Sequence, residues 1–227
     1  MRSRMSSDMG AEAQLAAFLD EHFYPWLSKR YGYDCITRVD ELELQYKGID
    51  VITYANGRIS YVDEKAQLYY MQDPLPTFAF ELSFLRAGEE RLGWFINDEL
   101  MTETYLLLFP RSDVDVSKVT KTDFKSVEAI ALSKKKLREY LSDRGLDKET
   151  LRKKADAIRR SRKTGRIDRA FSGIDIRGIY LYASSPSRYI EAPINLVIGK
   201  DHLKRVANAS FIITKDAAEE IKEKDDV

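Results

Sequence analysis

The residues best suited to chemistry lie on either side of Asn56-Gly57. An Asn-Gly pair between two β-rich runs predicts a two-residue hairpin turn, and strand partners across that turn have residue numbers that sum to 113. Asp50 then faces Asp63 in a non-hydrogen-bonded pair, with Cα atoms about 4.5 Å apart. Facing carboxylates repel each other. One of them is therefore protonated, the hairpin bulges, or a cation lies between them; we favour the cation.

Lys65 adds an amine to this pair of acids. Side chains alternate along a strand, so Asp63, Lys65 and Gln67 are expected on one face, with Lys65 opposite Gly48, which leaves room for a long side chain. Mg²⁺ favours carboxylate oxygens together with substrate phosphate. Such an ion polarises the phosphate and lowers the pKa of an attacking water, while the ammonium orients that water or offsets negative charge. The set predicts phosphodiester hydrolysis with Mg²⁺ or Mn²⁺ held by Asp50 and Asp63.

An acid followed two residues later by lysine is a weak signal by itself, expected about three times by chance in a chain of this composition. It also occurs at Asp123/Lys125 and at Glu220/Lys222, where no hairpin partner carries an acid. The alternative reading is an exposed hairpin with incidental charges. Charged residues inside an otherwise apolar strand pair are unusual, which favours the functional reading.

The elements that must position these residues can be read from hydrophobic periodicity and turn residues. An amphipathic helix is expected first, ended by Gly32. The expected elements are a helix over 11–30, strands over 35–38, 49–55, 58–68 and 77–84, a helix over 89–101, and a strand over 104–109. The order is α-β-β-β(-β)-α-β.

This hairpin resembles the active-site hairpin of the PD-(D/E)XK nuclease superfamily. The resemblance rests on Gly48-Ile49-Asp50-Val51-Ile52, on Asn56-Gly57, and on Ile59 to Val62 leading into Asp63-Glu64-Lys65. The nearest pattern is that of archaeal Holliday-junction resolvases and related restriction-type endonucleases. It covers about residues 11–110 and implies a restriction endonuclease-like core, a central mixed β-sheet flanked by helices, with an α/β C-terminal extension. Ile49 replaces the Pro of the motif, and the segment 34–47 is longer than in compact resolvases.

The resemblance also implies roles for individual residues. Asp50 and Asp63 correspond to metal ligands, Lys65 to the catalytic lysine, and Gln67 to an accessory polar residue. Glu12 fits the early glutamate of the family and would be a further metal ligand. On a helical wheel Glu12 lies about 20° from Leu19, in the middle of the apolar face. The alternative is that Glu12 merely occupies a first helical turn, where the helix dipole favours acids.

Composition narrows the choice of metal. The chain has 227 residues and is 44% hydrophobic, enough for a sizeable core. One Cys and two His exclude a disulfide framework within the chain and a multi-cysteine zinc site, so a metal would rest on carboxylates.

The N-terminus lacks an apolar signal segment, and no apolar run approaches the roughly 18 residues of a membrane span. A cytoplasmic protein is expected.

The zero net charge conceals two blocks of opposite sign. Residues 1–110 contain 10 basic and 18 acidic side chains, whereas residues 134–169 contain 15 basic and 6 acidic ones. Basic helices over 134–143 and 148–163 are typical of a phosphate-facing surface. The alternative is a solvated helix face. Beyond them, strands over 176–183, 194–198 and 210–214 and a helix over 201–206 are expected.

These observations predict a nuclease-like core over 11–110 and a basic C-terminal extension over 111–227. The predicted function is a Mg²⁺-dependent deoxyribonuclease that cuts duplex or branched DNA and contacts it through residues 134–169. The alternatives are a non-catalytic DNA-binding or assembly module on the same fold, and a structural protein whose basic helices are simply solvated. No membrane partner is expected. The sequence leaves open a homodimer, DNA specificity, and endonuclease against exonuclease action.

Overall fold

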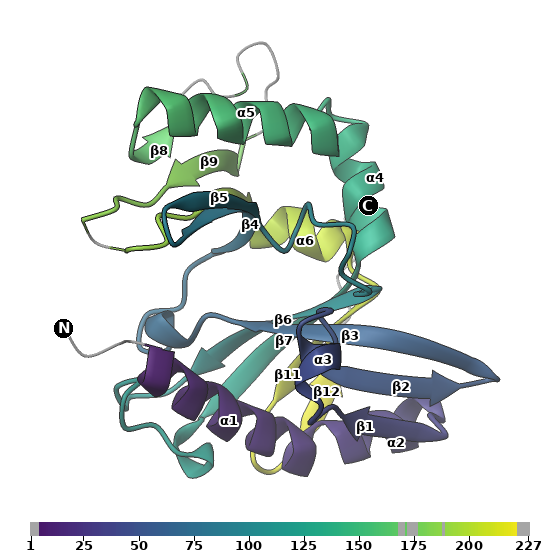
Figure 1. Cartoon of the computed structure of the whole chain (residues 1–227). Coiled ribbons are helices and arrows are strands. Elements are labelled where there is room, and N and C mark those ends of the chain that lie inside the picture. The colour runs from purple at the N-terminus through teal and green to yellow at the C-terminus, as the bar shows by residue number, and fades with distance from the viewer. Residues whose placement is uncertain (1–4, 168–170, 172–176, 188, 222–227) are drawn as a thin grey trace. The chain divides into compact units, whose positions relative to one another are not determined.

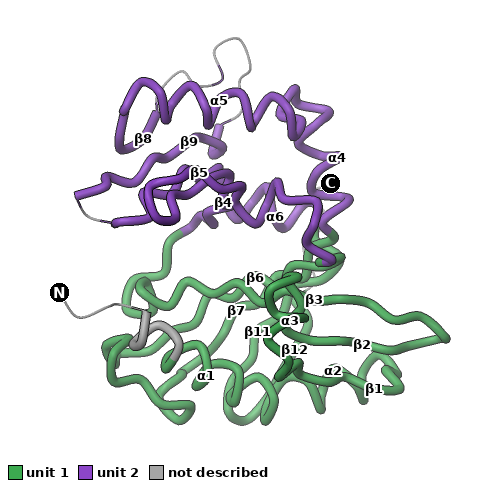
Figure 2. The backbone as a smooth tube through the Cα atoms, in the orientation of Figure 1, with its two compact units in different colours: residues 1–75, 102–133, 207–227 green, residues 76–101, 134–206 purple. Residues whose placement is uncertain are grey.

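The computed structural model describes residues 5–167, 171, 177–187 and 189–221. The chain divides into two compact units, each made of separate chain segments (Figure 2). Unit 1 comprises residues 1–75, 102–133 and 207–227, and unit 2 comprises residues 76–101 and 134–206. Neither unit coincides with the predicted ranges 11–110 and 111–227. Among the described helices, none is both long enough and apolar enough to cross a membrane.

Unit 1 is built around a large, curled mixed sheet (Figure 1). Its strands are β1 (Cys35–Arg38), β2 (Val51–Ala55), β3 (Arg58–Ala66), β6 (Thr104–Arg111), β7 (Ser126–Ser133), β11 (Ala209–Ile213) and β12 (Ala218–Glu220). Within the described residues they lie in the order β1-β2-β3-β6-β7-β11-β12. β3 and β6 are parallel, and the other neighbours are antiparallel. A parallel pair needs a long crossover, and here that crossover includes residues 76–101 of unit 2.

The helices of unit 1 follow its apolar residues. They are α1 (Met5–His22), α2 (Tyr24–Tyr31) and the short α3 (Leu42–Gln45), with the 3₁₀ turns η1 (Leu68–Tyr70) and η2 (Lys121–Asp123). Leu15, Phe18 and Leu19 of α1 are buried in one core with residues of β2, β6, β7 and β11. The expected single helix over 11–30 is two helices, because Pro25 begins a new helix at its first turn. Gly32 (φ 68°) ends α2, as predicted.

The predicted hairpin register is confirmed from the turn out to Val51 and Val62, but the predicted pair of Asp50 with Asp63 lies beyond the paired residues, and the Asp50 N–H donates to Val62 instead. Val51 pairs with Val62, and each step toward the turn preserves the sum of the residue numbers down to Ala55 and Arg58. Asn56 and Gly57 both have positive φ, 52° and 76°, which is the backbone that a type I′ turn requires.

Unit 2 forms a second, antiparallel sheet, ordered β5-β4-β10-β9-β8 in the described part of the chain. Its elements are β4 (Thr77–Arg86), β5 (Glu89–Leu92), α4 (Lys134–Ser142), α5 (Lys148–Ser161), β8 (Gly165–Ile167), β9 (Ile179–Ala183), β10 (Ile194–Gly199) and α6 (Lys200–Val206). α5 lies across one face of the sheet (Figure 1) and buries Leu151, Ala155 and Ile158. Both predicted basic helices are present. Residues 168, 169 and 176 of the predicted basic region and strand, and Lys222, lie outside the described residues.

The helix expected over 89–101 is wrong. β4 turns back through Ala87 (φ 52°) and Gly88 (φ 83°) into β5. The chain then packs tightly against β4 at Gly93, where a Cβ atom would lie 2.3 Å from the carbonyl oxygen of Glu81. A side chain cannot fit at this position, so glycine permits the close approach.

Candidate active site

The hairpin brings Asp50, Asp63 and Lys65 together at one place. The Lys65 ammonium forms an ion pair with Asp63, and Asp63 is close enough to Asp50 to raise the pKa of its carboxyl group. The Asp63 side chain is 1% exposed, whereas that of Lys65 is 28% exposed. A buried carboxylate thus has one acid and one amine as direct neighbours.

Asp50 marks the point where the regular strand ladder ends. Its N–H donates to the carbonyl oxygen of Val62 at 2.9 Å, and its Oδ2 accepts the N–H of Glu64 at 2.8 Å. The Asp50 carboxylate thereby accepts the Glu64 N–H, which would donate to a main-chain carbonyl group if the ladder continued. The predicted position of Lys65 opposite Gly48 is wrong, because Gly48 (φ 72°) lies in the turn after α3 and outside the paired register.

Burial and charge act in opposite directions on this group of side chains. Burial raises the pKa of Asp50 to about 6, and Asp63 adds to the increase, while Lys65 and the Glu64 N–H oppose it. Burial lowers the pKa of Lys65, but the carboxylates of Asp63 and Asp50 outweigh that effect and hold it above its ordinary value. Lys65 is therefore an ammonium at neutral pH.

Asp50→Asn should stabilise the metal-free protein. Because the pKa of Asp50 is 3.8 ordinarily and about 6 in the fold, its ionised form opposes folding above that pH, and the penalty disappears as both states become protonated. The asparagine oxygen can still accept the Glu64 N–H. We expect a gain of about 1–2 kcal/mol near pH 8, discounted for partial exposure, that shrinks toward about pH 4. Urea unfolding in EDTA measures it, with exposed Asp73→Asn as the control; an unchanged or lower stability near pH 8 contradicts the prediction.

A cavity of about 440 Å³ opens beside these residues, and Glu12, Arg38, Asp50, Glu64 and Lys65 are among those that line it. Glu12 reaches the cavity from α1, and its charge helps to raise the pKa of Lys65. Its side chain is exposed, not directed into the core as the helical wheel indicated. α1 begins at Met5, so Glu12 does not occupy the first turn, and the helix-dipole alternative does not explain its position.

Gln67 is not among the described residues that line this cavity, although Ala66 before it is. β3 ends at Ala66, so the expected alternation does not extend to Gln67. Its N–H donates to the carbonyl oxygen of Leu108 at 3.0 Å. Asp63, Lys65 and Gln67 were predicted on one face of the strand. Only Asp63 and Lys65 lie within β3, and Gln67 follows its last residue.

No family model, curated protein or solved structure matches this chain.

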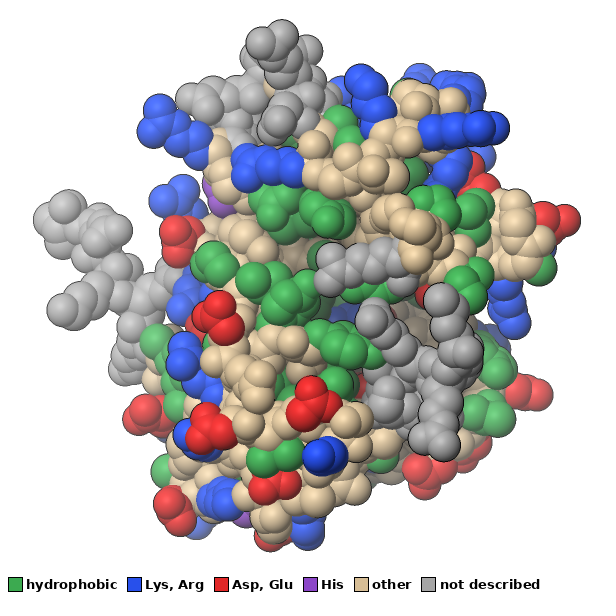
Figure 3. Space-filling model, turned by 90° about the vertical axis from the view of Figure 1, so that its left-hand side faces the viewer, with side chains coloured by type: hydrophobic (Ala, Val, Ile, Leu, Met, Phe, Trp, Pro, Cys, Tyr) green, Lys and Arg blue, Asp and Glu red, His purple; other side chains and the backbone are tan. Residues whose placement is uncertain are grey.

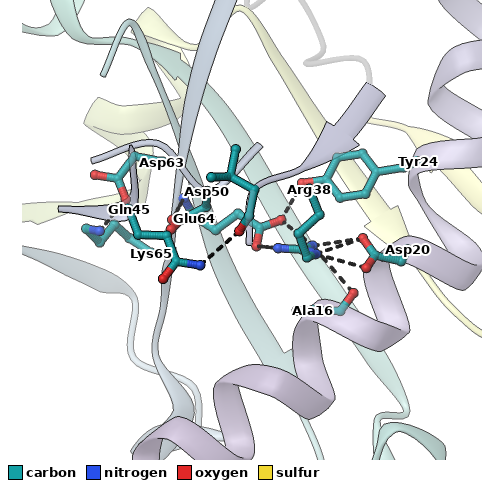
Figure 4. A network of polar contacts seen from close by, with 10 residues as sticks. Ala16, Asp20, Tyr24, Arg38, Gln45, Asp50, Asp63, Glu64 and Lys65 are labelled. Atoms are coloured by element: carbon teal, nitrogen blue, oxygen red, sulfur yellow. Dashed lines mark hydrogen bonds and ion pairs between the residues drawn. The ribbon is translucent and has the colours of Figure 1, made fainter. Parts of the chain in front are cut away.

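Sequence reasoning missed a second polar network on β3, built around Glu64 (Figure 4). Arg38 of β1 donates to Glu64 Oε2 at 2.8 Å and, from its Nε, to Asp20 Oδ2 of α1 at 2.9 Å. The Tyr24 hydroxyl also donates to Glu64. Burial raises the pKa of Tyr24 most, and the Glu64 charge raises it further, so the hydroxyl keeps its proton and remains a donor. Figure 4 shows Arg38 between the two acids. The sequence signal was an acid between Asp63 and Lys65, which alternation along the strand places on the opposite face from those two residues.

Thr102 is a further neighbour that the sequence did not indicate. Its buried hydroxyl donates to the carbonyl oxygen of Gly48 at 2.8 Å and lies 3.5 Å from Asp63 Oδ2. It therefore ties the turn before Asp50 to the chain beside Asp63. An isolated threonine before a strand carries no sequence signal for this role.

The donor set fits a hard divalent cation in chemistry. Asp50 and Asp63 present adjacent carboxylates whose mutual repulsion a cation would relieve, and Mg²⁺ commonly takes one or two carboxylates with waters and phosphate. Across the described residues, no group of three or more His, Cys, Asp or Glu side chains is arranged to hold a metal ion. The predicted ligand set of Glu12, Asp50 and Asp63 thus does not come together as a group of three.

Proposed function

We propose that this chain is a Mg²⁺-dependent nuclease of the PD-(D/E)XK type that hydrolyses DNA phosphodiester bonds. The observation that carries the proposal is the convergence of Asp50, Asp63 and Lys65 where β2 and β3 meet. Further support comes from the setting, a mixed sheet in which β3 pairs in parallel with β6 and α1 covers one face. A restriction endonuclease-like core is part of this proposal.

Each residue of the site has a chemical role in the proposal. Asp50 and Asp63 would hold Mg²⁺ or Mn²⁺, which supplies charge stabilisation for the phosphate and acidifies a bound water. Lys65 is an ammonium that orients the attacking water or offsets negative charge on the phosphate. Asp63 and Asp50 are the main causes that raise the pKa of Lys65, and Glu12 adds a smaller contribution from the cavity. Thr102 and the Glu64 N–H position the two carboxylates.

The distribution of charge between the units supports DNA as the substrate. Unit 1 has 15 basic and 23 acidic side chains, whereas unit 2 has 22 basic and 14 acidic ones. Contacts with the DNA backbone come mainly from Lys and Arg. We therefore assign DNA binding to unit 2, which contains the basic region 134–169.

The basic residues of that region divide into two kinds. Lys134 is buried, Arg138 is paired with Asp98 at 2.8 Å, and Arg159 with Glu90 at 3.3 Å, so these stabilise unit 2. Arg160, Arg162 and Lys163 are exposed, and none of them forms an ion pair with another described residue. This second set, at the C-terminal end of α5, is available to phosphates.

The second candidate is a non-catalytic DNA-binding or assembly module on the same fold. The ion pair between Lys65 and Asp63 favours it, because a lysine can neutralise a buried acid that holds no metal. The two functions make opposite predictions for metal binding.

Isothermal titration with Mg²⁺ and Mn²⁺ should detect one ion per chain. Asp63→Asn should weaken that binding at least about tenfold, because one of two charged ligands is removed. Asp73→Asn, an exposed acid outside the cavity, should bind as the unaltered protein does. Absence of metal binding in the unaltered protein would favour the module.

A further inference from the structure

The sheet of unit 2 has one face that presents aromatic side chains. Leu181, Leu196 and Phe80 are register neighbours on β9, β10 and β4, and all three are fully buried. Leu82, two residues from Phe80 on the same side of β4, lines a cavity with Ala155 of α5, so this is the face that α5 covers. Side chains alternate along β9, so Tyr180 and Tyr182 project from the opposite face. Tyr182 is 38% exposed.

An arginine lies beside these tyrosines on the same face. Arg166 of β8 pairs in register with Tyr182. Its guanidinium carbon lies 4.1 Å from the ring centroid of Tyr180, the geometry of a cation–π contact. The Arg166 guanidinium thus covers the ring of Tyr180, while Tyr182 is the register neighbour of Arg166 and its ring is exposed.

Positive charge adjoins this face along the chain. The exposed residues Arg160, Arg162 and Lys163 directly precede β8, whose first residue is Gly165. Glu81, an acid on the same face, lies on β4, separated from β9 by β10. In its upper part, which belongs to unit 2, Figure 3 shows Lys and Arg side chains next to hydrophobic ones. Basic residues beside exposed aromatic rings are the features with which proteins bind single-stranded nucleic acid.

We propose that Tyr180, Tyr182 and Arg166 form a stacking surface for unpaired DNA bases, with Arg160, Arg162 and Lys163 contacting the phosphates of the same strand. Every base has a π-face, so the surface binds without sequence preference. The biological use of this surface rests on the proposed nuclease function, because unit 2 would hold single-stranded segments of the nuclease substrate. The argument for the surface itself depends only on the geometry of unit 2.

The test uses the full chain in EDTA and fluorescence anisotropy. The ligands are a labelled thymidine oligonucleotide of about 12 nucleotides and a duplex of the same length. Tyr182→Ala should weaken binding of the single strand about tenfold and change duplex binding less than about twofold, because stacking contributes only where bases are unpaired. Tyr182→Phe should bind the single strand as the unaltered protein does. Arg160, Arg162 and Lys163 replaced together by alanine should weaken binding of both ligands and reduce the salt dependence.

Tyr54→Ala is the matched control, because Tyr54 is also a strand tyrosine, is 40% exposed, and lies on β2 of unit 1. It should leave both affinities unchanged. The inference is overturned if the unaltered protein does not bind the single strand, if Tyr182→Ala binds it normally, or if Tyr182→Phe loses as much as Tyr182→Ala. Tyr182-dependent binding without metal-dependent cleavage would support the surface and refute the nuclease; cleavage without such binding would do the reverse.

Discussion

Asp63→Asn should reduce Mg²⁺-dependent DNA cleavage by about 1,000-fold or more while leaving DNA binding intact. The buried Asp63 carboxylate forms an ion pair with Lys65, so its loss removes a proposed metal ligand and the partner of the lysine at once. A loss of several kcal/mol in transition-state stabilisation corresponds to this factor. Single-turnover cleavage of a labelled duplex measures the rate, and anisotropy in EDTA measures binding.

Lys65→Ala should reduce the rate about 100-fold by removing an ammonium from the site. Its matched control is Lys125→Ala, because Asp123-Phe124-Lys125 has the same spacing as Asp63-Glu64-Lys65. Lys125 is exposed and paired with Asp113, so its replacement should leave cleavage unchanged. Undiminished cleavage by Asp63→Asn would refute the proposed site.

Arg38→Ala should lower the free energy of unfolding by about 2–3 kcal/mol. Arg38 bridges Asp20 and Glu64, and the side chain of Glu64 is only 11% exposed. Removal of the cation leaves a nearly buried carboxylate without its ion pair, a change that costs more than loss of an exposed pair. Urea unfolding at neutral pH measures the difference.

A second variant separates two effects of Arg38→Ala, the unpaired charge left on Glu64 and the loss of packing by the Arg38 side chain. Adding Glu64→Gln to Arg38→Ala should recover about 1 kcal/mol, because the amide carries no charge and can still accept from the Tyr24 hydroxyl. Arg58→Ala is the control, since the Arg58 side chain is 76% exposed and pairs with Glu103 at 3.7 Å; it should change stability by less than about 0.5 kcal/mol. An effect of Arg38→Ala as small as that of Arg58→Ala would contradict the role of the network.

The hairpin could be predicted from the sequence because its geometry is local. Asn56 and Gly57 tolerate positive φ, and the two-residue turn then dictates every pair out to Val51 and Val62. The approach of Asp50 to Asp63 follows from that register. The exact arrangement at Asp50 could not be predicted, because its carboxylate competes with the main chain for the Glu64 N–H.

Elements decided by tertiary contacts were less predictable. Leu92, Phe95 and Ile96 have helical spacing, yet the turn at Ala87-Gly88 and the close packing at Gly93 make this segment a strand followed by turns. Arg38 and Thr102 were missed for a related reason. Each reaches its partners across long stretches of chain, and local patterns contain no information about such pairs.

Because each unit is made of segments that are far apart in the sequence, neither can form from one continuous stretch of chain. β4 precedes the β6–β7 pair in sequence, whereas its partner β10 follows that pair. Neither unit is therefore complete until synthesis has passed β10, and the sheet of unit 1 also waits for β11. A cut at residue 110 would leave β4 without β10 and β6 without β7. A fragment that contains unit 1 alone must therefore join residue 75 to residue 102 and residue 133 to residue 207, and cannot be made by truncation.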